Sequence, residues 1–200
     1  MTFHPLIDYA TFHRSERDLG DRGEPFAYTA DNRARFDEII KRYPPDRKRS
    51  AVLPALYLVQ YQLGYITANV MRYVAGLLEI TPADVEDVVS FYTMFYTRPV
   101  GRFVLQVCRT LSCAVNGAGR VTEALSEKLG IQPGQTDESG TFTLLEVECL
   151  GACDRAPVVM VNDAWHECLA PEAAAALVDD LRARGEAALS GCHHAVEGKK

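Results

Sequence analysis

The sequence predicts an α/β (α+β) protein in which a small bundle of helices precedes a domain built on a sheet. Apolar residues first recur at helical spacing, and after Arg98-Pro99-Val100-Gly101 the period changes to that of a strand. Cysteines then follow at the ends of two expected strands. These observations divide the chain into a polar arm at 1–30, a helical bundle at 31–97, a sheet domain at 98–185 and a disordered tail at 186–200.

The composition indicates a globular chain whose partners are proteins. Of its 200 residues, 48% are hydrophobic and 24% charged, which supports a sizeable core. A net charge of −6 argues against nucleic acid as a partner, since a phosphate backbone needs a basic face. No stretch is apolar enough to insert in a membrane, and Met1–Pro5 lacks the basic start of a signal peptide. We therefore expect a cytoplasmic chain, in which six cysteines favour metal or redox chemistry over disulfides.

Four helices are expected in the bundle. The first carries Phe36, Ile39 and Ile40 at helical spacing, and the later helices are marked by residues that cap or close a helix. These markers are Pro44-Pro45 after the first helix, Ser50 and Gly64 around the second, Thr67 before the third and Thr81-Pro82 before the fourth.

An aromatic run, Phe91, Tyr92, Phe95 and Tyr96, ends the bundle. Exposed aromatic side chains would form a docking surface for a partner, whereas buried ones would complete the core of the bundle. The sequence leaves both uses open.

The sheet domain is expected to alternate strands and helices. A right-handed crossover makes the first two strands parallel, so that their carboxyl ends reach the same edge of the sheet. Cys108 ends the first of these strands and Cys149 the second. The expected elements are a strand at 103–107, a helix at 114–129, strands at 142–148, 157–162 and 164–169, a turn at Asn162-Asp163, and a helix from Pro171.

The spacing of four cysteines points to a metal centre. Cys108 and Cys113 enclose four residues, and Cys149 and Cys153 enclose three. Four thiolates on two loops suit a dinuclear iron centre. A structural zinc site is an alternative, although such sites commonly use loops with two intervening residues. A thiol oxidoreductase would normally contain Cys-x-x-Cys, which the chain lacks.

The residues between the cysteines support a cluster. Gly151 would let the backbone approach it, and Thr110 and Ser112 offer hydroxyl donors, which raise a cluster's potential. Arg109 and Arg155 would act in the same direction or dock an acidic partner, unless they are ordinary solvated arginines.

Three other features are expected to have no part in this chemistry. Cys168 lies in an apparent strand and is interpreted as a small core residue. Cys192-His193-His194 falls in the tail expected to be disordered. Gly117-Ala118-Gly119 begins like a dinucleotide fingerprint but lacks its third glycine, so these glycines are interpreted as a helix start.

Two strings around the cysteines resemble a known family. Cys108-Arg109-Thr110-Leu111-Ser112-Cys113 and Glu148-Cys149-Leu150-Gly151-Ala152-Cys153-Asp154 are similar to the thioredoxin-like 2Fe-2S subunit, the small iron-sulfur subunit in the NADH dehydrogenase module of bacterial NADH-quinone oxidoreductase, respiratory complex I. The resemblance covers roughly residues 33–184. It implies a thioredoxin-like 2Fe-2S ferredoxin domain after the bundle, with Cys108, Cys113, Cys149 and Cys153 as cluster ligands.

The resemblance also implies a role within a larger assembly. One 2Fe-2S cluster per chain would exchange single electrons with the FMN of a partner subunit, which also binds NADH, beside further iron-sulfur subunits. The assembly would be peripheral to the inner membrane, and the chain alone would not turn over NADH. Equivalent subunits of a soluble NAD-linked hydrogenase or formate dehydrogenase share these strings, and a zinc-stabilised adaptor is a third alternative.

Overall fold

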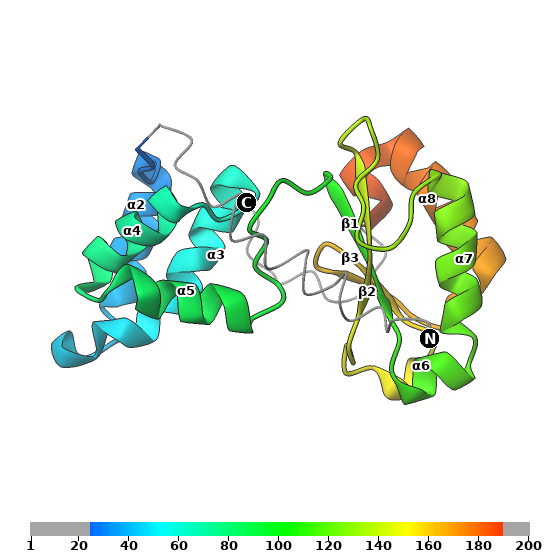
Figure 1. The fold of residues 1–200 in the computed structure, drawn as a ribbon, viewed down its shortest axis with the longest axis horizontal. Coiled ribbons are helices and arrows are strands. Elements are labelled where there is room, and N and C mark those ends of the chain that lie inside the picture. Colours follow the sequence, from blue (N-terminus) through cyan, green and yellow to red (C-terminus); the bar gives the residue numbers. More distant parts are fainter. Residues whose placement is uncertain (1–24, 190–200) are drawn as a thin grey trace, which may run out of the picture. The chain divides into compact units, whose positions relative to one another are not determined.

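Two compact units make up the part of the chain that the structure, a computed structural model, describes, namely residues 25–189 (Figure 1). The division between them falls at the bond from Pro99 to Val100. Our expectations for the start of the chain and for Cys192-His193-His194 lie outside the described residues. Between residues 25 and 189, no helix has both the length and the apolar character needed to cross a membrane.

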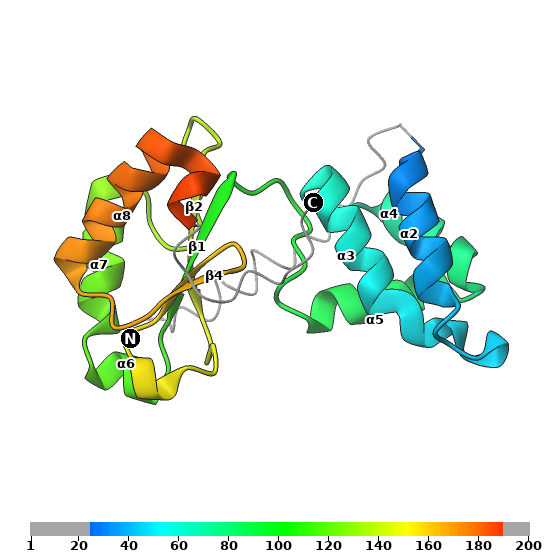
Figure 2. The ribbon, with the colours of Figure 1, turned by 180° about the vertical axis from the view of Figure 1, so that it is seen from behind.

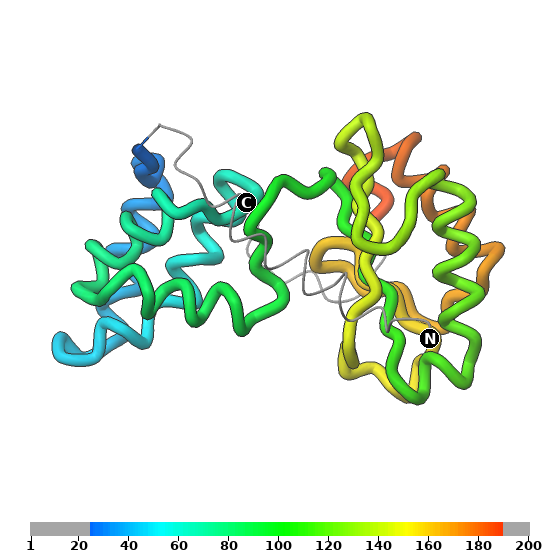
Figure 3. Tube along the Cα trace, in the orientation of Figure 1, coloured from blue at the N-terminus to red at the C-terminus, as the bar shows by residue number. Residues whose placement is uncertain are grey.

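The first unit is a helical bundle whose helix ends follow local capping signals. The Thr67 hydroxyl accepts a hydrogen bond from the Val70 amide at 3.3 Å, and Thr81 and Asp84 cap each other's backbone amides. Gly64 closes a helix with a φ of 90°. These predicted ends are confirmed. The unit comprises α2 (Ala30–Ile40), the 3-10 helix η1 (Pro45–Ala51), α3 (Val52–Leu63), α4 (Ala68–Leu78) and α5 (Pro82–Phe91). Figure 3 traces the chain through this unit from blue to green.

The predicted cap at Ser50 is wrong, because the chain is already helical there. Pro45 begins η1, which runs to Ala51, and α3 follows directly from Val52. A capping residue needs extended backbone to aim its side chain at the following amides. Ser50 lies inside a helical turn instead. Pro45, expected only to follow the end of the first helix, therefore also starts the next helical segment.

The bundle includes residues that we expected in the polar arm. Tyr28 is buried, and its hydroxyl donates a hydrogen bond to the Ala55 carbonyl at 2.7 Å. Thr29 caps α2, since its hydroxyl accepts a hydrogen bond from the Asn32 amide at 3.3 Å. The bundle thus begins before residue 30.

The aromatic run at the end of the bundle serves mainly the core. Phe95 and Tyr96 are buried, and the ring of Phe95 lies edge-on to Tyr57 with centroids 5.3 Å apart. Phe91 is 76% exposed. Of the two uses that the sequence left open, core packing therefore applies to Phe95 and Tyr96, and Phe91 remains at the surface.

The second unit is a four-stranded sheet in the order β2-β1-β3-β4. Strands β1 and β2 are parallel, in register from Phe103 opposite Phe142 to Cys108 opposite Val147, as the crossover argument predicted. Strands β3 and β4 form an antiparallel hairpin. The unit comprises β1 (Phe103–Cys108), α6 (Leu111–Val115), α7 (Ala118–Leu129), β2 (Phe142–Val147), the 3-10 helix η2 (Cys153–Arg155), β3 (Val159–Val161), β4 (Ala164–His166), α8 (Pro171–Arg184) and the 3-10 helix η3 (Gly185–Leu189).

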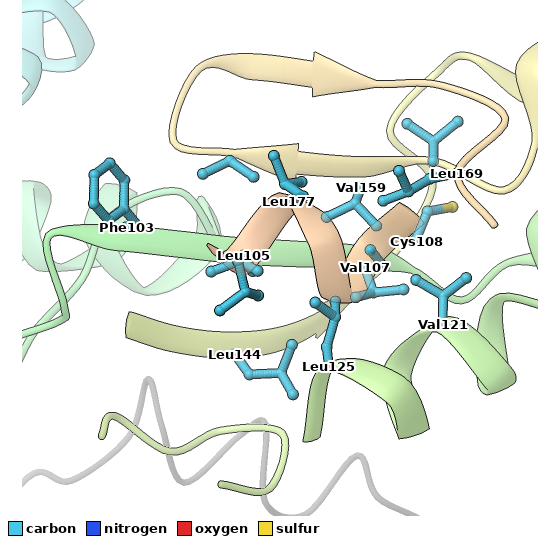
Figure 4. Packing of buried hydrophobic residues seen from close by; sticks show 14 of the residues in the cluster. Phe103, Leu105, Val107, Cys108, Val121, Leu125, Leu144, Val159, Leu169 and Leu177 are labelled. Carbon is cyan, nitrogen blue, oxygen red and sulfur yellow. The ribbon is translucent and has the colours of Figure 1, made fainter. Parts of the chain in front are cut away.

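Helices α7 and α8 lie side by side on one face of this sheet (Figures 1 and 2). Between sheet and helices, Val107 of β1, Leu125 of α7 and Leu144 of β2 are completely buried and converge in Figure 4. Burying each such side chain is worth about 1.5–3 kcal/mol. Cys108, at the end of β1, belongs to the same cluster. The core therefore fixes the edge of the sheet from which the cysteine loops depart.

The helix expected at 114–129 is broken in two. Helix α6 begins earlier, at Leu111, and α7 begins at Ala118. Gly117 between them has a φ of 93°, a left-handed conformation that glycine adopts readily and that ends a helical turn. As expected, these glycines mark a helix start, with Gly117 directly before α7.

The last two strands are shorter than expected, covering 159–161 and 164–166 rather than 157–162 and 164–169. The Cys168 amide donates a hydrogen bond to the Arg155 carbonyl at 2.7 Å, and the Leu169 amide donates one to the Pro157 carbonyl at 3.0 Å. These bonds draw the chain out of the sheet. The interpretation of Cys168 as a core residue is consequently wrong, because its side chain is exposed.

Candidate metal centre

The four cysteines singled out by the sequence lie at the carboxyl ends of β1 and β2. Cys108 is the last residue of β1, and Cys113 lies in α6, which follows directly. Cys149 comes two residues after β2 ends, and Cys153 begins η2. Since Cys108 pairs with Val147 in the parallel ladder, both loops leave the sheet at the same edge.

The thiols form two pairs that differ in burial. Cys108 and Cys113 are each 2% exposed, whereas Cys149 and Cys153 are exposed. The sulfur atoms of Cys149 and Cys153 are 3.4 Å apart. The inner pair is covered by the core, and the outer pair faces the surface.

Within the inner pair, the two thiols have different acidities. Burial, the hydrogen bond with Cys108 and the charge of Cys108 raise the pKa of the Cys113 thiol to about 11, with a smaller contribution from Cys153. Burial also opposes ionisation of Cys108. Hydrogen bonds from the Thr110 hydroxyl, from backbone amides and from Cys113 outweigh that burial, and they lower the pKa of the Cys108 thiol.

In the outer pair, too, the pKa of one thiol is lowered and that of the other is raised. Hydrogen bonds from the Gly151 amide, the Cys153 thiol and the Thr110 hydroxyl lower the pKa of Cys149, against the charge of Cys108. The hydrogen bond with Cys149 and its charge raise the pKa of Cys153. Because the charge of Cys108 acts on all three other thiols, the two loops form one electrostatic site.

The pairing bears on which metal would fit. Within residues 25–189, no three histidine, cysteine or acidic side chains gather around one point as ligands of a single ion. A structural zinc site needs four ligands around one ion. In a 2Fe-2S cluster each iron takes two cysteines, which two separate thiol pairs can supply. Four thiols paired on two loops are therefore a donor set that a dinuclear cluster can use, two for each iron.

The loop between Cys149 and Cys153 depends on a glycine. Gly151 has a φ of 86°, and its amide lies 3.4 Å from the Cys149 sulfur, to which it donates. A Cβ atom at this position would lie 3.9 Å from the ring of Trp165. The Gly151 backbone thus approaches the Cys149 sulfur, and Trp165 lies on the side of the loop that a Cβ would face.

The two arginines that flank the cysteines differ in their surroundings. The Nη2 atom of Arg109 lies 2.9 Å from a carboxylate oxygen of Glu148, and the Arg109 side chain is 24% exposed. Arg155 is 60% exposed and lies 3.6 Å from Asp154. Arg155 is an ordinary surface arginine, whereas Arg109 joins the two cysteine loops. Glu148 stands in one of the two cysteine strings, but its pairing with Arg109 was not predicted.

The chain matches the profile of the thioredoxin-like 2Fe-2S ferredoxins over residues 36–182. It belongs to the thioredoxin-like 2Fe-2S ferredoxin family. The resemblance inferred from the cysteine strings is thereby confirmed, and so is the fold class. The family assignment covers both the helical bundle and the sheet unit.

Relatives of this ferredoxin chain share one name, that of an NADH-quinone oxidoreductase subunit. The relative from Rickettsia bellii is 42% identical over 158 residues, which cover 78% of this chain and 95% of the relative. The relative from Mycobacterium tuberculosis is 44% identical over 164 residues, 80% of this chain and 64% of the relative. The chain thus spans somewhat less than two thirds of the mycobacterial relative.

Among solved structures, the ferredoxin chain is similar to part of an NAD⁺-reducing NiFe-hydrogenase in the H2-reduced state. The TM-score is 0.59 at 22% identity, over 67% of this chain and 22% of the hydrogenase chain. At this identity the similarity concerns the fold alone.

Proposed function

We propose that the chain is an electron-transfer subunit of an NADH-quinone oxidoreductase and holds one 2Fe-2S cluster on Cys108, Cys113, Cys149 and Cys153. The observation that carries this proposal is the pairing of four thiols at one sheet edge, in a chain of the 2Fe-2S ferredoxin family. The name shared by the relatives from Rickettsia and Mycobacterium supports the assignment to that complex.

The cluster supplies a centre that accepts and returns one electron at a time. The protein's part is to hold it and to set its surroundings. Cys108 and Cys113 anchor it against the core, and Cys149 and Cys153 hold it at the surface. The Gly151 amide donates to the Cys149 sulfur, and the Thr110 hydroxyl lies 3.2 Å from the Cys108 sulfur, where it would donate to a thiolate ligand and offset its negative charge.

The partner in this proposal is a subunit that carries FMN and binds NADH, within an assembly that includes further iron-sulfur subunits and is peripheral to the inner membrane. Two exposed apolar residues support docking at the cysteine edge. Leu111 and Val115 are 79% and 78% exposed, and they are four residues apart on α6, the helix that carries Cys113. A partner seated there would lie beside the cluster.

An equivalent subunit of a soluble NAD-linked hydrogenase or formate dehydrogenase is the second candidate. The similarity to the NAD⁺-reducing hydrogenase favours it, but only at the level of the fold. The relatives at 42% and 44% identity favour the quinone-linked complex. Purification of the native assembly, followed by identification of its subunits and its electron acceptor, separates the two.

The first experiment measures metal and sulfide in the anaerobically purified chain. We expect about two irons and two acid-labile sulfides per chain. Alanine in place of Cys108, Cys113, Cys149 or Cys153 should abolish or severely destabilise the cluster, while Cys168→Ala and Cys192→Ala should retain it. Zinc without labile sulfide would favour a zinc-stabilised adaptor and contradict the proposal.

The second experiment concerns the division of labour. The isolated, flavin-free chain should not oxidise NADH, since neither nucleotide nor flavin has a recognisable binding motif in this sequence. Robust NADH turnover by the chain alone would contradict the partner assignment without affecting the cluster assignment.

A further inference from the structure

An ion pair joins the two cysteine loops directly. Arg109 follows Cys108, and Glu148 precedes Cys149. The Nε and Nη2 atoms of Arg109 lie 3.2 Å and 2.9 Å from the same carboxylate oxygen of Glu148. Each partner is thus one residue away from a thiol, and the two thiols belong to different pairs.

The backbone places this ion pair at the end of the parallel ladder. Cys108 lies opposite Val147 in the register, and the Arg109 amide donates a hydrogen bond to the Val147 carbonyl at 3.0 Å. Beyond this point β1 continues into α6 and β2 continues into the loop toward Cys153. The Arg109–Glu148 ion pair therefore lies where the segments after β1 and β2 leave the sheet.

Its contribution to global stability should be small, because solvent screens exposed ion pairs. Arg109 is 24% exposed and Glu148 66%. Another ion pair of the same unit, Lys128 with Asp179 at 2.7 Å, links α7 to α8 away from the cysteine loops and provides a matched comparison. The distinctive property of Arg109 and Glu148 is their position between the loops.

We propose that Arg109 and Glu148 are positioning residues of the cluster site. The pair holds Cys108 and Cys149 at a fixed separation and keeps the net charge beside the cluster at zero. This inference rests on the proposed function, since it requires a cluster between the loops. It adds a role in retention and redox tuning for two side chains that are not ligands.

The electrostatic part predicts shifts of opposite sign. The reduced cluster carries one more negative charge than the oxidised cluster, so nearby positive charge raises its potential and negative charge lowers it. Arg109→Gln leaves the Glu148 carboxylate uncompensated and should lower the potential. Glu148→Gln leaves the Arg109 guanidinium uncompensated and should raise it. The double variant should return close to wild type.

The positional part predicts rescue by charge reversal. Arg109→Glu alone places two carboxylates together and should speed loss of iron and sulfide by several-fold. Combined with Glu148→Arg, it restores an oppositely charged pair and should recover most of the retention. Lys128→Gln removes a paired cation of the same unit and should change neither retention nor potential.

The test uses the full chain, purified anaerobically, with circular dichroism to establish folding. It measures the reduction potential of the cluster, the rate of iron loss to a chelator and the electron-spin-resonance spectrum of the reduced protein. Shifts of the same sign for both amide variants, no shift in either, or failure of charge reversal to rescue retention would each overturn the positioning role. A wild-type chain without a cluster would overturn the proposed function as well, so the two failures are distinguishable.

Discussion

The hydroxyl oxygen of Thr110 lies 3.2 Å from the sulfur of Cys108. Thr110 occupies the N-terminal capping position of α6, yet its side chain makes no capping hydrogen bond to that helix. A threonine at this position ordinarily bonds to the helix amides. The same hydroxyl contributes to lowering the pKa of the Cys149 thiol, after the Gly151 amide and Cys153. Thr110 therefore acts on the cysteines rather than on its helix.

Replacing this hydroxyl should change the potential of the cluster. Thr110→Val removes a donor that favours the more negative, reduced state, so the potential should fall. A loss of about 1 kcal/mol corresponds to roughly 40 mV for a one-electron couple. Thr110→Ser keeps the hydroxyl and should remain near the wild-type value. A redox titration of both variants checks this, and equal potentials for valine and serine would contradict it.

Gly151 should not tolerate a side chain. Its φ of 86° costs other residues about 1–2 kcal/mol, while the nearest atom to an added Cβ lies 3.9 Å away, an ordinary contact. Gly151→Ala should thus strain the loop without a clash and speed cluster loss in the presence of a chelator. Gly119→Ala is the control, because this α7 position has open space around it and should gain about 0.5–1 kcal/mol in stability.

At Cys168, unlike at Gly151, glycine should be more favourable than a residue with a side chain. It is an exposed, non-glycine residue with a φ of 49°. Cys168→Gly relieves that strain, which costs a non-glycine residue about 1–2 kcal/mol. Glycine also increases the conformational entropy of the unfolded chain, which lowers stability by about 0.4–1 kcal/mol. The free energy of unfolding should therefore rise by roughly 0.5 kcal/mol. Cys168→Ala keeps the strain and should leave stability unchanged. Denaturant titration of the two variants measures the difference. A loss of stability in the alanine variant would indicate that the side chain is packed after all.

These stability predictions concern places where local sequence signals were insufficient. Thr67, Thr81 and Gly64 were predictable because a cap or a left-handed glycine acts on its own helix within a few residues. Cys168 was not, since its conformation is set by a hydrogen bond to Arg155, thirteen positions earlier in the chain. The strand periodicity around it gave no sign of that bond.

The candidate site shows the same division between local and long-range information. The convergence of Cys108 and Cys149 followed from two parallel strands, a rule that needs only the order of elements. The pairing of Arg109 with Glu148 needed the register of those strands as well. Spacing alone could suggest a dinuclear centre, whereas the contrast between a buried and an exposed thiol pair emerged only with the core in place.

The last prediction uses Trp165, the one tryptophan of the chain. Its ring lies 3.9 Å from the point where a Cβ atom on Gly151 would stand, and Gly151 is in the loop between Cys149 and Cys153. Trp165 also packs against the core cluster that contains Cys108. An iron-sulfur cluster absorbs broadly in the near ultraviolet and visible range and quenches the emission of a nearby indole. Tryptophan emission should therefore be weak in the loaded chain and increase severalfold when a chelator removes the iron.

Two variants test whether the cluster is the quencher and Trp165 the source of the emission. Cys153→Ala should have high emission that the chelator does not change, because no cluster is present to quench it. Trp165→Phe should retain the cluster, since phenylalanine still covers the loop with an apolar ring, and should lose the tryptophan signal. The chelated wild type should keep the emission wavelength of a partly buried indole, which separates cluster loss from unfolding. Equal emission from loaded and chelated chains would mean that Trp165 does not lie beside the cluster and that the arrangement of the outer loop is incorrect.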